Sequence, residues 1–127
     1  MNLCWKVYWD NVNKHYSFAV AKNPKTDRYF LVNLSSLKTE ILYENYKGCK
    51  FNIKEVQKIL TPHIYSGIER KYSLLRLGEK SIALNELQQR MKGKNQANFP
   101  EEFKQRVKQY VKNSLKGDLK REFINFI

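Results

Sequence analysis

Residues 3–34 read LCWKVYWDNVNKHYSFAVAKNPKTDRYFLVNL, and this stretch decides the expected fold because apolar side chains recur at every second position. The alternation runs through three segments, residues 3–9, 15–21 and 28–34. The two connections between them are short and rich in Asn, Asp, Lys and Pro, which are typical of turns. The sequence therefore predicts a meander of three antiparallel strands.

The segments that follow the meander change from strand to helix patterns. Residues 37–46 fit either a fourth strand or a helical turn, and their Thr, Ile and Tyr favour a strand. Asn52 followed by Glu55 forms a capping-box pattern, which predicts the start of a helix. Further helices are expected over about 62–77, 81–91 and 99–115, from their apolar spacing and from Pro62, Gly78 and Pro100 near their ends.

These patterns predict an α+β fold in one domain of 127 residues. The expected architecture is an N-terminal antiparallel sheet of three to four strands, over about residues 1–47. Three to four helices over about residues 52–127 then pack on that sheet. The last residues, 119–127, are too apolar for a free tail, so we expect them to dock on the domain or on a partner.

The charge balance is the strongest functional signal. Lys and Arg number 24 against 12 Asp and Glu, which gives a formal net charge of +12 and a pI near 9.7. An excess of this size creates a positive potential over much of the surface and favours polyanionic partners. Nucleic acid and an acidic protein surface both fit. An anionic membrane is a weaker fit, and the sequence does not choose between DNA and RNA.

The expected compartment, and with it the redox state of the cysteines, follows from the sequence features that mark membrane and secreted proteins. No apolar run reaches the roughly 18 residues that a membrane span needs. The first residues do not resemble a secretory signal, so we expect a cytoplasmic protein. Cys4 and Cys49 are the two cysteines, and in that compartment two thiols are favoured over a disulfide.

The expected binding surface combines a basic helix, the loop before it and two tyrosines of the sheet. The helix from Phe103 to Leu115 alternates a buried apolar stripe with lysines every four residues, which phosphates could neutralise. If Trp5 and the other large aromatics of the meander face inward, its tyrosines face outward and could stack on bases. The predicted nucleic-acid-binding residues are Arg90, Lys92, Lys94, Lys104, Arg106, Lys108, Lys112, Lys116, Tyr8 and Tyr29.

The sequence offers little for catalysis, so we predict no catalytic residue, no cofactor and no metal ligand. His15 and His63 are the two histidines, and they do not share metal-site spacing with the cysteines. Residues 69–91 resemble a helix-turn-helix only weakly. A small metal-independent ribonuclease could use His63, Tyr65, Glu69, Arg70 and Tyr72, which lie within ten residues.

Three functions therefore stay open. The first is a non-enzymatic nucleic-acid-binding protein that holds the phosphate backbone through the basic C-terminal helix and loop. The alternative is a protein-interaction module, such as an inhibitor or regulator encoded by a phage or mobile element, that binds an acidic surface or the nucleic-acid channel of a larger machine. The third is the ribonuclease. A homodimer through the apolar C-terminus is compatible with the sequence but not required by it.

Overall fold

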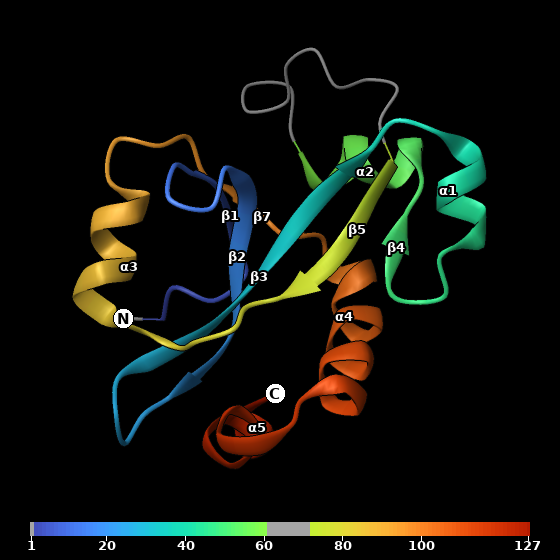
Figure 1. The fold of residues 1–127 in the computed structure, drawn as a ribbon. Helices are drawn as coiled ribbons and strands as arrows, with labels where there is room; N and C mark the ends of the chain where they lie inside the picture. Colours follow the sequence, from blue (N-terminus) through green and yellow to red (C-terminus); the bar gives the residue numbers. More distant parts are fainter. Residues whose placement is uncertain (1, 61–71) are drawn as a thin grey trace.

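The computed structural model describes residues 2–60 and 72–127, and its centre is a twisted sheet (Figure 1). Seven strands of the described residues form this sheet, in the order β4-β5-β3-β2-β1-β7, with β6 also paired to β3. All these strand pairs are antiparallel. The strands are β1 (Lys6–Asp10), β2 (His15–Asn23), β3 (Arg28–Leu37), β4 (Lys50–Phe51), β5 (Tyr72–Leu77), β6 (Ile82–Ala83) and β7 (Ala97–Asn98).

The meander predicted from residues 3–34 is confirmed. Strand β2 lies between β1 and β3, with Tyr8 opposite Ser17 and Ala19 opposite Leu31. The ladder shifts register between Ala19 and Ala21, which is a bulge in β2. The alternating pattern was sufficient to predict this pairing, because each hairpin joins two strands that are close together in the sequence.

The expected division into an N-terminal sheet and a helical second half is wrong. The chain is α+β, but β4, β5, β6 and β7 come from residues 50–98 and extend the sheet. Strand β5 lies within the helix expected over residues 62–77, and the rest of that expected helix falls outside the described residues. Strands β4, β6 and β7 have two residues each, which is too short for any periodicity, so they form through pairing with distant partners.

The helices agree with the sequence where a local signal exists. Helix α2 carries the complete capping box, because Asn52 Oδ1 accepts from the Glu55 amide and the Glu55 carboxylate accepts from the Asn52 amide. Helix α1 stands where a strand was favoured, and it buries no residue; Ile41 and Leu42 are exposed. The helices are α1 (Glu40–Asn45), α2 (Ile53–Ile59), α3 (Leu84–Met91), α4 (Glu101–Ser114) and α5 (Gly117–Phe123), followed by the 3-10 turn η1 (Ile124–Phe126).

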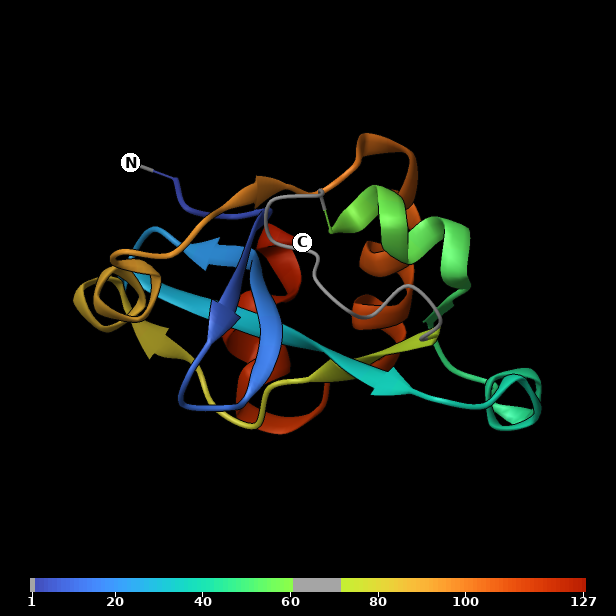
Figure 2. The same cartoon turned by 90° about the horizontal axis from the view of Figure 1, so that it is seen from above.

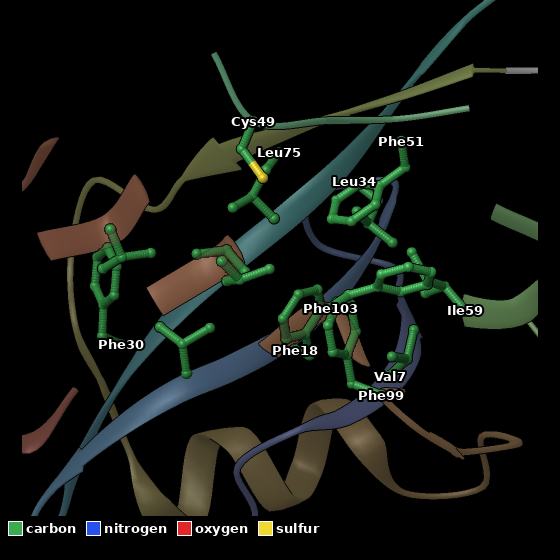
Figure 3. Close-up of a cluster of buried hydrophobic side chains, with 14 of the residues drawn as sticks. Val7, Phe18, Phe30, Leu34, Cys49, Phe51, Ile59, Leu75, Phe99 and Phe103 are labelled. Atoms are coloured by element: carbon green, nitrogen blue, oxygen red, sulfur yellow. The ribbon is translucent and has the colours of Figure 1, made fainter. Parts of the chain in front are cut away.

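Both faces of the sheet are covered, which the sequence did not predict. Helices α2, α4 and α5 cover one face and enclose the larger core, where Phe18, Phe99 and Phe103 meet (Figure 3). Helix α3 covers part of the other face with Leu87 and Met91. The two views show α3 on one side of the meander and α4 on the other (Figures 1 and 2).

The apolar C-terminus docks on the domain itself. Phe123 is fully buried, and its ring centroid lies 5.8 Å from that of Phe30. Ile127 packs against the same core. This confirms one of the two expected positions for the chain end, and it removes most of the apolar surface on which a partner at this end was expected to dock.

Candidate nucleic-acid interface

Helix α4 provides the basic surface that the sequence predicted. Glu101 and Glu102 stand in its first turn, where the helix dipole favours acids. Phe103, Val107 and Val111 are buried and anchor the helix to the sheet. Gly117, with φ of +61°, follows shortly after the helix ends.

The cations of α4 lie on two different flanks of that buried stripe. Positions 104, 108 and 112 advance by only about 40° per step around a helix, whereas position 106 lies about 200° from 104. Lys104, Lys108 and Lys112 therefore form one row, and Arg106 lies beyond the opposite flank. The expected single basic face of the helix is divided by the core contact.

The first half of the lysine row lies against Trp5. The Nζ atoms of Lys104 and Lys108 lie over the indole ring, 5.3 and 6.0 Å from its centroid. The ring rests on Phe18 and Phe99, with centroid separations of 5.8 and 5.5 Å. Cations over an indole face are held by the ring quadrupole. We name Trp5, Lys104, Lys108 and Lys112 the lysine edge.

Trp5 has a backbone conformation that is rare for a bulky residue. Its φ is +66°, in the left-handed region that side chains with a Cβ disfavour. Two hydrogen bonds hold it there: the Trp5 amide donates to the Ala19 carbonyl at 2.8 Å, and the Phe99 amide donates to the Trp5 carbonyl at 2.9 Å. Such strain persists only where the surroundings enforce it, and it is concentrated at functional sites.

Trp5 contributes to the lining of two hollows of the surface. One, of about 490 Å³, is lined by Lys6, Asn98 and Lys104 among others. The other, of about 300 Å³, includes Lys22 and Lys108 in its lining. Cys4 also lines both hollows, so they adjoin the same part of the chain.

The charges around Trp5 are mostly positive. Lys104 pairs with Glu101 at 2.7 Å, and Lys22 pairs with Asp27 at 3.4 Å. Lys108 and Lys112 make no ion pair within residues 2–60 and 72–127. Two ammonium groups of the lysine edge are therefore uncompensated by any described acid.

Both burial and the neighbouring lysines affect the pKa of the Cys4 thiol. Burial raises the pKa of Cys4 to about 11, while Lys22 and Lys104 act in the opposite direction. Cys49 is also a free thiol with its pKa raised to about 11 by burial; Cys49 is buried, whereas Cys4 is half-buried.

Arg106 and Arg90 are engaged in contacts within the fold. Arg106 donates to Glu55 at 2.6 Å and lies over the rings of Phe51 and Phe103. The hydrogen bond that Arg106 donates to Glu55 raises the pKa of Arg106. Arg90 pairs at 3.2 Å with Asp10, whose side chain is fully buried. Both arginines therefore hold elements together, and the lysines remain for binding.

Three predicted lysines, Lys92, Lys94 and Lys116, lie outside helix α4. Lys92 is exposed and Lys94 half-buried; with Gly93 they line a hollow of about 330 Å³ next to α3. Lys116 is exposed at the start of α5. The structure brings together Lys104, Lys108 and Lys112 from the predicted set, and it places Lys92 and Lys94 with α3.

The expectation that Tyr8 and Tyr29 face outward is wrong. Both rings are fully buried in the core beneath α3, so neither can stack on a base. The physical reason is the second covered face of the sheet: side chains that alternate away from the main core meet Leu87 and Met91 of α3. The alternation of the sequence placed Trp5 inside, so Trp5 was not among the predicted binding residues. Its ring does pack against the larger core, but Trp5 is only half-buried.

The remaining expectations concern other parts of the chain. Residues 72–77 form a strand, so the helix-turn-helix interpretation is wrong. The ribonuclease set, apart from Tyr72, lies outside the described residues. Among residues 2–60 and 72–127, no group of three His, Cys, Asp or Glu side chains could hold a metal ion. None of the helices in that part of the chain has the length and apolar composition of a membrane span.

Another hollow has none of the residues of the lysine edge in its lining. It has about 750 Å³ and includes His15, Arg76, Lys80 and Arg90 in its lining. A comparison of the chain with protein-family models, curated proteins and solved structures finds no match.

Proposed function

We propose that this protein binds nucleic acid without cleaving it and holds the phosphate backbone along the lysine edge. The observation that carries the proposal is the pair of ammonium groups, from Lys104 and Lys108, gathered over the indole ring of Trp5. An aromatic ring within a row of cations is a common arrangement for binding a sugar-phosphate chain.

Counterion release would drive binding along the lysine edge. Each phosphate that a lysine neutralises frees a condensed cation, so binding depends steeply on salt. Lys108 and Lys112 suit this role because no described acid pairs with them, and Lys104 can exchange its exposed Glu101 partner for a phosphate. An exposed pair of this kind contributes little to stability, so exchanging it costs little.

The proposal is narrower than the surface that the sequence predicted. Arg90 and Arg106 are left out of the proposed site because their side chains make contacts within the fold. Trp5 takes the place of Tyr8 and Tyr29 as the aromatic residue of the site. Lys6 and Lys22 join the site from β1 and β2, because each lines one of the two hollows that Trp5 also lines. The net charge of +12 adds long-range attraction for the same partner.

The test is a fluorescence-anisotropy titration of labelled DNA and RNA, single- and double-stranded, at several salt concentrations. The proposal expects binding that weakens linearly on a logarithmic salt scale, with a slope set by about three to four neutralised phosphates. Absence of binding to all four nucleic acids at low salt would refute it. The protein-interaction alternative would then be tested by a search for acidic partners.

A further inference from the structure

We infer, on the basis of the proposed function, that the preferred ligand is a single strand, with one unpaired base stacked on Trp5. The inference concerns the ring and not the lysines. Lysines alone bind the backbone of either form, whereas a base can reach an aromatic side chain only when its face is free.

The Trp5 ring packs against the core, and the ends of flexible lysine side chains also lie over it. Phe18 and Phe99 belong to the buried cluster and cannot shift without disturbing it. The groups over the ring are the ends of Lys104 and Lys108, on long flexible side chains. A base can take their place when the ammonium groups move to the adjoining phosphates, and the core then needs no rearrangement.

The space beside the ring suits a base. The two hollows that Trp5 lines, of about 490 and 300 Å³, are of the size that holds small organic molecules. Asn98 Oδ1 and the Lys6 ammonium, which bond to each other at 2.5 Å, lie in the lining of the larger one. They provide polar groups at the edge of a stacked base.

Binding of a duplex through the same contact would cost free energy. Its bases are already stacked on one another, so presenting one to Trp5 requires breaking a pair and a stack. A single strand has no such cost. The strained backbone of Trp5, with φ of +66°, supports a role for the ring itself, because such strain is concentrated at functional sites.

The experiment uses the fluorescence of Trp5 in a Trp9→Phe variant, where Trp5 is the one remaining tryptophan. Trp9 is a suitable residue to replace, since it is 37% exposed and stacks edge-on against Tyr16. The ligands are oligothymidylate, oligouridylate, a duplex of the same length, and an abasic strand with the same number of phosphates. The abasic strand separates contacts to phosphate from contacts to bases.

The inference predicts that oligothymidylate or oligouridylate quenches Trp5 and binds more tightly than the duplex and the abasic strand. Trp5→Ala should weaken single-strand binding by about tenfold or more, with little effect on duplex binding. Trp5→Phe should restore most of the affinity. Because Trp5→Ala removes packing, Trp5→Leu serves as a second variant that keeps an apolar contact with Phe18 and Phe99.

Three results would overturn the inference in different ways. Equal affinity for single strands, duplex and abasic strand, with unchanged Trp5 fluorescence, refutes stacking and leaves the lysine-edge proposal intact. Absence of binding to every ligand at low salt refutes both. Quenching without any affinity loss in Trp5→Leu also counts against stacking, because displaced lysines alone would then explain the signal.

Discussion

Replacing Lys108 and Lys112 with glutamine removes the two cations of the lysine edge that have no ion-pair partner among the described residues. Glutamine keeps a similar aliphatic length and helix propensity, so α4 should stay folded. Lys38→Gln combined with Lys47→Gln is the matched control. Both control lysines are exposed and flank α1, and the two double variants lower the net charge equally.

The size of the effect follows from the number of phosphates that lose a partner. For a single strand, losing two contacts makes the slope of log K against log salt shallower by about 1.4, and for a duplex by about 1.8. If the contribution vanishes near 1 M salt, the affinity at about 0.1 M should fall roughly 25-fold for the single strand and 60-fold for the duplex. The control variant should lose far less.

The assay is an anisotropy titration of both double variants and the unmodified protein between about 50 and 300 mM salt, the range where the backbone term is large. Circular dichroism first establishes that both variants are folded. Equal losses of affinity and of slope in the two double variants would refute the reasoning, because binding would then depend on net charge and not on the lysine edge.

Three further predictions concern the fold. Arg90→Ala should lower the free energy of unfolding by about 3–5 kcal/mol in urea titrations, since it leaves the fully buried Asp10 carboxylate without its cation; a loss below about 1 kcal/mol would contradict this. Asn52→Ala should cost about 1 kcal/mol through loss of the α2 cap, and an unchanged urea midpoint would count against it. Cys4 and Cys49 have pKa values raised from 9.0 to about 11. Unfolded thiols therefore ionise first, and stability should fall from pH 9 to pH 11. Thiol reagents should react slowly with the buried Cys49 at pH 8, whereas rapid labelling of Cys49 in the folded protein would contradict its burial.

Local signals in the sequence predicted the elements that local interactions decide. The capping box of Asn52 and Glu55 needs only one helical turn, and it is present in α2. The stripe of Phe103, Val107 and Val111 fixed the position and orientation of α4. These features could be predicted because their partners lie within a few residues or on one face of one element.

Elements that depend on distant partners could not be predicted. Residues 72–77, YSLLRL, are apolar enough for a helix or a buried strand, and the choice is made by pairing with β3 and β4. Residues 40–45 form a helix that buries nothing, so no apolar pattern marks it. Two-residue strands such as β7 exist only because β1 offers them an edge.

The candidate site was predicted in part for the same reason. Lys104, Lys108 and Lys112 follow from helical spacing, and their position on one flank of α4 was accessible from the sequence. Trp5 was not, because the alternation of residues 3–9 assigned it to the core. Its side chain packs against the same core as Val7, as the alternation requires, but it stays half-buried. The left-handed backbone at Trp5 carries no sequence signal of the kind that glycine or asparagine gives.

The measurement that tests the central claim most directly is a titration of nitrogen-15-labelled protein with a single-stranded oligonucleotide, followed by two-dimensional NMR. The account predicts that the indole N–H signal of Trp5 and the amide signals of residues 104–112 shift first and most, while those of α1 stay in place. Shifts centred on the hollow of Arg76 and Arg90, or no shifts at low salt, would contradict it.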